Sequence, residues 1–295
     1  MTVPIGAVFH IAHTCADVAT ADTWYREVLG AREFLPLHTL EPEKRDASLL
    51  VVADAVLEPV SPSFELDGWA ERSFGRYHQR FGTHWHSIAW YCSDPAELWR
   101  RCRAAGFRVN GMTGPVTEAP APDATLFTHP KDTLVQLQLT PGTGTRYESL
   151  DPRLRPGWDG GWWEREHPLG VRRLDHVAVV CPDLDAGLRV FVEVLGGKRL
   201  GDAAGPLTGS THTDVAVGDT VVRLAVPSGP GPAAEDLAAH GPCVHAVAFE
   251  VADLDRAATY LESAGVRVLD RDPTTLITDP ATTLGVPFHW VVRVS

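Results

Sequence analysis

The sequence lacks the features that would mark it as a membrane, secreted or nucleic-acid-binding protein. It has no run of about 18 apolar residues, the length that crosses a bilayer, so we expect no membrane-spanning helix. Its five cysteines are odd in number and form no C-x-x-C pair, and its first residues lack the basic start of a signal peptide, which predicts the reducing cytoplasm. Basic runs are also missing, and the formal net charge of −12 disfavours binding to nucleic acids and anionic membranes.

Several common catalytic motifs are missing as well. The chain contains no G-x-S-x-G, no P-loop, no G-x-G-x-x-G and no H-E-x-x-H. What is present is a 295-residue chain with 44% hydrophobic residues, which is enough for about two domains that each bury a core. We expect a small-molecule substrate as its partner, and a monomer or homodimer as its assembly.

The second half of the chain is a diverged copy of the first half. Without a gap, one register aligns His10, Cys15 and Asp17 with His176, Cys181 and Asp183. A second register, also without a gap, aligns His86 and Asp94 with His245 and Asp253. A repeat at a fixed offset indicates a duplicated structural unit.

Each half is itself double, because a histidine is followed 20 positions later by a glycine in four places: His10, His86, His176 and His245. An aspartate follows each histidine by seven or eight positions, where it can cap a helix that the glycine then ends. We predict an α+β protein of four strand–helix–strand modules, near residues 7–62, 82–140, 172–228 and 241–295. They form an N-terminal domain (1–150), a linker (151–170) and a C-terminal domain (171–295).

The segment between the halves is rich in Gly, Pro and charge, and it contains Trp158, Trp162 and Trp163. We predict a linker whose tryptophans cover the seam between the halves. Three further stretches with many turn-forming residues are predicted to be long loops over a pocket: 61–82, 110–124 and 227–241.

The repeated histidines have possible metal-binding partners in the first half. Glu58 lies in the apolar run Val56–Val60, where a bare carboxylate is costly without a cation. Gln136 and Gln138 lie late in the second module and share one face of their strand. If the two modules join their sheets, His10, Glu58, His86 and one of these two glutamines can converge on one divalent ion such as Fe, Mn, Co, Ni or Zn. His13 has the opposite strand parity to His10, and we expect a structural role for it.

The second half offers a different set of residues. His176 and His245 repeat the first-half histidines, and His289 occupies the late-strand position that Gln138 holds. The counterpart of Glu58 is Arg223, a cation that would oppose a metal ion. We keep His176, His245 and His289 as a possible second metal site.

The module openings resemble the vicinal oxygen chelate superfamily, which includes glyoxalase I, bleomycin resistance proteins and extradiol dioxygenases. The segments LDHVAVVCPDL (174–184) and VHAVAFEVADL (244–254) are similar to its opening signature, and THPKDT (128–133) resembles a segment of methylmalonyl-CoA epimerases. The resemblance implies βαβββ modules that pair so that their sheets cup one metal ion. It places the family's ligand positions on His10, Glu58, His86 and Gln138.

The resemblance also implies a range of reactions. We expect metal-stabilised enolate or enediolate chemistry on a small carbonyl substrate, as in an epimerase, isomerase or glyoxalase-type lyase, with Glu58, Glu43 or Glu41 as the base. One alternative is an extradiol-type Fe(II) dioxygenase, although His289 stands where that class has a glutamate. The other alternative is a metal-free protein that binds small molecules or drugs.

Overall fold

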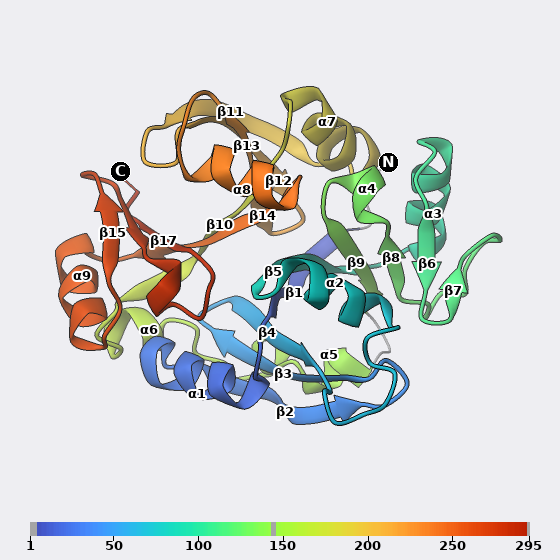
Figure 1. The fold of residues 1–295 in the computed structure, drawn as a ribbon, viewed down its shortest axis with the longest axis horizontal. Coiled ribbons are helices and arrows are strands. Elements are labelled where there is room, and N and C mark those ends of the chain that lie inside the picture. Colours follow the sequence, from blue (N-terminus) through green and yellow to red (C-terminus); the bar gives the residue numbers. More distant parts are fainter. Residues whose placement is uncertain (1–4, 143–145, 294–295) are drawn as a thin grey trace. The chain divides into compact units, whose positions relative to one another are not determined.

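A computed structural model of the chain describes residues 5–142 and 146–293. Its elements follow the fourfold repeat, and most of them are labelled in Figure 1. The first half contains β1 (Ile5–Thr14), α1 (Val18–Leu29), β2 (Arg32–Leu40), β3 (Arg45–Val52), β4 (Ala55–Pro62), α2 (Ser73–Phe81), β5 (His84–Cys92), α3 (Pro95–Ala104), β6 (Val109–Gly111), β7 (Gly114–Pro115), β8 (Leu126–Thr128), α4 (Pro130–Thr133) and β9 (Gln136–Pro141).

The segment that joins the halves contains short helices: α5 (Arg146–Leu150), the 3₁₀ helix η1 (Pro152–Leu154) and α6 (Trp162–Arg165). The second half contains β10 (Val171–Val180), α7 (Leu184–Leu188), the π-helical turn η2 (Arg189–Val194), β11 (Lys198–Gly205), β12 (Ser210–Val217), β13 (Thr220–Pro227), α8 (Pro232–His240), β14 (Cys243–Val251), α9 (Leu254–Ser263), β15 (Val268–Arg271), β16 (Thr275–Thr278), the 3₁₀ helix η3 (Pro280–Thr282) and β17 (Phe288–Val291).

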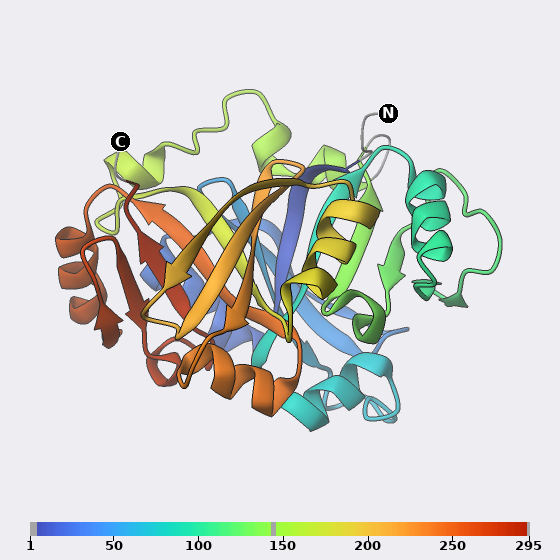
Figure 2. The ribbon, with the colours of Figure 1, turned by 90° about the horizontal axis from the view of Figure 1, so that it is seen from above.

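The strands form two mixed sheets, which confirms the predicted α+β class. Strands β1–β9 follow the order β2-β3-β4-β1-β5-β9-β8-β6-β7, and strands β10–β17 follow the order β11-β12-β13-β10-β14-β17-β16-β15. In each module the first strand pairs in parallel with the last strand, as β1 does with β4. Figure 2 shows β11, β12 and β13 side by side, in yellow to orange, as an antiparallel ribbon.

The helix caps that the repeat predicts are confirmed. The carboxylates of Asp17, Asp94, Asp183 and Asp253 each accept a backbone N–H from the first turn of the following helix. At the other end of α1, Gly30 has a φ of 63°, the left-handed conformation that glycine adopts without steric cost. None of the helices in the described part of the chain has the length and apolar character needed to cross a membrane.

The late strands of the modules share one register position. In each parallel pair, the late-strand residue that the sequence singles out lies opposite an alanine of the first strand. The pairs are Glu58 with Ala12, Gln138 with Ala89, Arg223 with Ala178 and His289 with Ala248. The alignment of Gln138 with His289, and of Glu58 with Arg223, is therefore confirmed.

Two of the predicted loops contain a helix, α2 and α8. In α2, Phe74, Tyr77 and Phe81 recur at helical spacing, a signal that the surrounding Gly, Pro and charged residues obscure. Phe74 packs on a small apolar cluster of Ala12, Ala47 and Val60, so burial of this face fixes the helix. The prediction of loops at 61–82 and 227–241 was wrong to this extent.

The described residues group into two compact units. The first unit draws on Met1–Phe9, Ser87–Ser149 and His176–His245, and the second on His10–His86, Leu150–Asp175 and Ala246–Ser295. Each unit therefore contains segments from both halves of the sequence. The domain boundaries 1–150, 151–170 and 171–295 remain a proposal, and their outer ends at 1–4 and 294–295 lie outside the described residues.

Within the second unit, the segment between the halves packs tightly. Trp163 is completely buried, and its indole N–H donates to the carbonyl of Leu29 at the end of α1. The guanidinium of Arg32 lies over the rings of Trp162 and Trp163, at 4.5 and 4.9 Å from their centres. Hydrophobic burial, a hydrogen bond and cation–π contacts thus hold this segment on α1.

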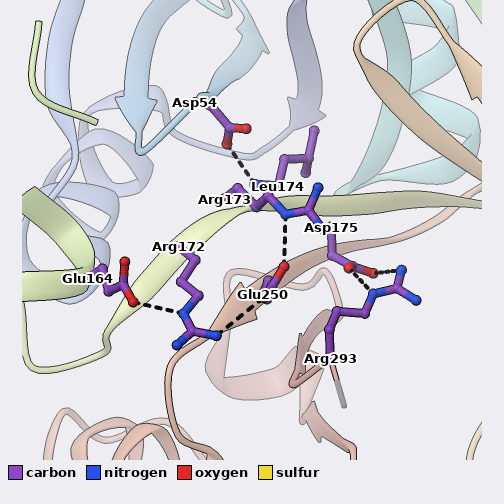
Figure 3. Close-up of polar contacts among 8 residues, drawn as sticks. All are labelled: Asp54, Glu164, Arg172, Arg173, Leu174, Asp175, Glu250 and Arg293. Atoms are coloured by element: carbon purple, nitrogen blue, oxygen red, sulfur yellow. Dashed lines mark hydrogen bonds and ion pairs between the residues drawn. The ribbon is translucent and has the colours of Figure 1, made fainter. Parts of the chain in front are cut away.

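A polar network secures the next stretch of the same unit (Figure 3). The buried carboxylate of Glu250 accepts from Arg172 at 3.4 Å and from Arg173 at 2.8 Å. One residue further on, the backbone N–H of Leu174 donates to Asp54 at 2.6 Å. Because Asp54 lies in the turn before β4, this bond connects the first half of the sequence to β10.

We predict that Trp163→Ala lowers the free energy of unfolding by about 3–5 kcal/mol, because it empties a fully buried site and removes the hydrogen bond to Leu29. Urea unfolding followed by circular dichroism measures this change. Leu154→Ala, an exposed site in the same segment, is the control and should stay within about 0.5 kcal/mol of wild type. Equal stability of both variants would show that the segment is a loose linker.

Candidate metal centre

Three of the predicted ligands come together in the second compact unit. His10 lies on β1, Glu58 on β4 and His86 at the start of β5. Glu58 pairs with Ala12, two residues from His10, so both side chains lie on the same face of the sheet. His10 Nε2 is 3.1 Å from Glu58 Oε2, and the two residues are only 3% and 7% exposed.

His86 belongs to the same electrostatic cluster and lies under aromatic side chains of α2. Its ring meets those of Tyr77 and Phe74 edge to face, at centroid distances of 4.5 and 5.5 Å. Desolvation, with the positive charge of Arg45 and the proximity of His10, lowers the pKa of His86 to about 3. Burial also lowers the pKa of His10, although Glu58 partly offsets it. Both imidazoles are therefore neutral near pH 7, the form in which histidine binds metal ions.

A cation that the sequence analysis did not identify borders the cluster. Arg45, at the start of β3, has its Nε 2.6 Å from Glu43 Oε2 and its Nη1 3.7 Å from Glu58 Oε1. Glu43 and Glu58 thus lie on either side of one guanidinium. Glu41, in the turn before β3, is exposed.

The donor chemistry of His10, Glu58 and His86 fits a divalent metal ion. Neutral imidazoles and a carboxylate are the side chains that bind Zn, Fe and similar ions. Two adjacent ligands of such an ion, each at about 2.1 Å, lie about 3 Å apart, and His10 and Glu58 are already at this separation. A cation beside a buried carboxylate also offsets the free-energy cost of removing its charge from water.

The structure does not test the fourth predicted ligand. Gln138 lies on β9, in the first compact unit, where its amide donates to the hydroxyl of Thr140 at 2.9 Å. It remains a proposed ligand.

In the second half, the residue at the position of Glu58 is already engaged. Arg223 forms two bonds to Asp214, at 2.8 and 2.9 Å, and His176 interacts electrostatically with the same carboxylate. His245 Nδ1 lies 2.7 Å from Asp236 of α8, whose other oxygen is 2.5 Å from His240 Nδ1. Buried His289 lies on β17, in the second compact unit. The set of His176, His245 and His289 remains a proposal.

The sequence contained weak signals for the residues it missed. Arg45 and Ala47 are two residues apart on β3 and so lie on the same face, where Ala47 packs against Ala12 and Val60. Tyr77 precedes His86 by nine residues and Asp236 precedes His245 by nine residues, and each contacts that histidine. The sequence alone does not show these contacts.

The repeated strand–helix–strand modules, arranged in two mixed sheets, define a duplicated α+β protein of the βαβββ type. The family model described as "Glyoxalase/Bleomycin resistance protein/Dioxygenase superfamily" matches residues 175–279. An ethylmalonyl-CoA/methylmalonyl-CoA epimerase from Cereibacter sphaeroides is 31% identical over 101 residues, which are 34% of this chain and 75% of the relative. The chain belongs to this superfamily, also called the vicinal oxygen chelate superfamily, which confirms the resemblance.

One solved structure is similar over the whole chain. A variant of 4-hydroxymandelate synthase from Streptomyces coelicolor superposes with a TM-score of 0.70 at 19% identity, covering 99% of this chain and 94% of that one. This similarity supports the α+β fold of the chain. By their names, 4-hydroxymandelate synthase and the epimerase relative are both enzymes.

His13 has the opposite strand parity to His10 on β1 and belongs to the core. It is fully buried, its Nδ1 is 2.8 Å from the hydroxyl of Tyr25, and its ring contacts that of Trp85. Burial lowers the pKa of His13 to about 3, so the folded protein keeps it neutral while the unfolded chain protonates it below about pH 6.5.

We predict that His13 makes the protein less stable as the pH falls below about 6.5, because the unfolded state then binds a proton that the folded state excludes. Between pH 6.5 and pH 5, wild type should lose about 2 kcal/mol more unfolding free energy than His13→Gln. Urea titrations of both proteins at the two pH values measure the difference. Parallel pH dependence in the two proteins would contradict the prediction.

Proposed function

We propose that the chain is a divalent-metal-dependent enzyme that moves a proton next to a carbonyl group, as an isomerase, epimerase or lyase. The observation that carries the proposal is the cluster of His10, Glu58 and His86, in which two neutral imidazoles and a buried carboxylate lie together. Membership of a superfamily whose name includes glyoxalases and dioxygenases supports enzymatic activity.

The residues of the cluster have separable roles in this proposal. His10, Glu58 and His86 hold the ion, with Gln138 as a fourth ligand, and the ion is Fe, Mn, Co, Ni or Zn. When bound, such an ion supplies Lewis-acid stabilisation of negative charge on a carbonyl oxygen.

Proton transfer is assigned to a carboxylate. Glu43 Oε2 is paired with Arg45, which leaves Oε1 to take a proton from the substrate carbon. Glu58 is the alternative base if it leaves the ion, and exposed Glu41 is the least favoured of the three. Phe74 and Tyr77 of α2 border the cluster and limit its contact with water.

A second candidate, an Fe(II)-dependent dioxygenase that uses the second half, has one observation in its favour. The contact of Asp236 with His245 Nδ1 resembles the way carboxylates orient metal-binding histidines, which they hold by the ring nitrogen that does not bind the ion. At the position equivalent to Glu58, Arg223 forms an ion pair with Asp214. The net charge of this pair is zero, so the position supplies no negative charge for an ion. We therefore favour the first-half centre.

We predict that wild type binds about one equivalent of a divalent metal ion, and that His10→Ala and Glu58→Gln each lose it, because each removes one of the three proposed donors. Metal content is measured by mass spectrometry after gentle purification. His38→Ala, a half-buried histidine on β2, is the matched control and should keep the ion, as should His176→Ala. Loss of the ion in His176→Ala alone would move the centre to the second half and favour the dioxygenase.

Turnover provides a separate test. Methylmalonyl-CoA is the first substrate to try, because it appears in the name of the epimerase relative, and exchange of its α-proton in D₂O is followed by NMR. We predict that Glu43→Gln retains the ion but exchanges about 10²- to 10⁴-fold more slowly, because a general base is removed. Unchanged exchange in Glu43→Gln would exclude this residue as the base. A metal-free wild type that binds ligands tightly and exchanges no substrate proton would favour the drug-binding alternative.

A further inference from the structure

Arg45 is a largely buried guanidinium with donors to spare. Its side chain is only 18% exposed, and it forms an ion pair with Glu43 through Nε. Its Nη1 lies 3.7 Å from Glu58, which is longer than a hydrogen bond. Within residues 5–142 and 146–293, the structure gives the guanidinium no further ion pair and no side-chain hydrogen bond. Most of its five N–H groups are therefore available to a ligand.

The charges around Arg45 favour an anion of low charge. Glu43 and Glu58 contribute two negative charges, against one from Arg45 and two from the divalent ion of the proposed function. The local sum is one positive charge, which matches a carboxylate better than a phosphate dianion. The planar fork of a guanidinium also matches the two oxygens of a carboxylate.

An apolar cluster lies on the same face of β3 as Arg45. Ala47 follows Arg45 by two residues and packs with Ala12, Val60 and Phe74. This face therefore continues from the charged residues into small aliphatic side chains and an aromatic ring. Such a surface suits a short hydrocarbon group next to an acid.

We propose that Arg45 binds a carboxylate group of the substrate, so that the substrate is a small carboxylic acid. This inference rests on the proposed function for the ion that completes the charge balance. Glu43 then acts on Arg45 as well as on a proton: its ion pair fixes the guanidinium and leaves Nη1 and Nη2 for the ligand.

The test compares two non-reactive probes of nearly the same shape. Oxamate carries one carboxylate beside an amide oxygen, and oxamide replaces this carboxylate with a second neutral amide. By isothermal titration calorimetry, wild type should bind oxamate at least about tenfold more tightly than oxamide. Arg45→Gln should weaken oxamate binding by about 10- to 100-fold, the worth of a charge-assisted hydrogen-bonded pair, and leave oxamide binding and metal content unchanged.

Two further variants control for charge and for folding. Arg103→Gln removes the same charge from an exposed site on α3 and should bind oxamate as wild type does. Arg45→Lys keeps the charge but loses the fork, so it should lose oxamate affinity by a smaller factor than Arg45→Gln. If Arg45→Gln fails to fold by circular dichroism, Arg45→Lys decides the matter, and wild-type affinity in that variant would overturn the inference.

The outcomes separate this inference from the proposed function. Metal binding by wild type with oxamate affinity that is independent of Arg45 would overturn the role of Arg45 and leave the metal centre standing. Oxamate affinity that depends on Arg45 in a wild type without metal would support the anion site and contradict the proposed function. Inorganic phosphate that binds through Arg45 where oxamate does not would overturn the assignment to a carboxylate.

Discussion

The buried carboxylate of Glu58 sets the requirement that organises the candidate site. A charge in the interior of a sheet is costly unless a cation or several donors accompany it. The neighbouring histidines cannot supply the charge near pH 7, because burial lowers the pKa of both His10 and His86. Arg45 approaches only to 3.7 Å and is shared with Glu43. The divalent ion that we propose at His10, Glu58 and His86 would meet this requirement.

The two halves of the chain carry different side chains at equivalent positions. The register opposite an alanine holds Glu58 in the first module and Arg223 in the third. Nine residues before the second histidine of each half, Tyr77 contributes an aromatic edge where Asp236 contributes a carboxylate. The fold tolerates these exchanges because the backbone pairing of the strands does not depend on the side chains at these positions. The halves therefore share an architecture while their chemistry differs.

Much of the fold was accessible from the sequence because its signals are local. The capping aspartates, the helix-ending glycine and the apolar strands act within a few residues, and the repeat shows them four times. His10, Glu58 and His86 could be predicted because polar residues stand out in apolar strands. Arg45 could not be predicted, since its place in the site depends on contacts between β3 and β4. Helix α2 was not predicted because Phe74 packs on an apolar cluster whose residues lie far from it in the sequence.

The central claim is that one ion is bound by two imidazoles and a carboxylate of the first half. X-ray absorption spectroscopy of the protein loaded with one equivalent of zinc tests it most directly, because imidazole rings give a distinct outer-sphere scattering pattern. The account predicts two imidazole nitrogens and otherwise oxygen donors, at the usual distances of about 2.0–2.2 Å. Three imidazoles, as the set of His176, His245 and His289 would provide, or none at all, would contradict it.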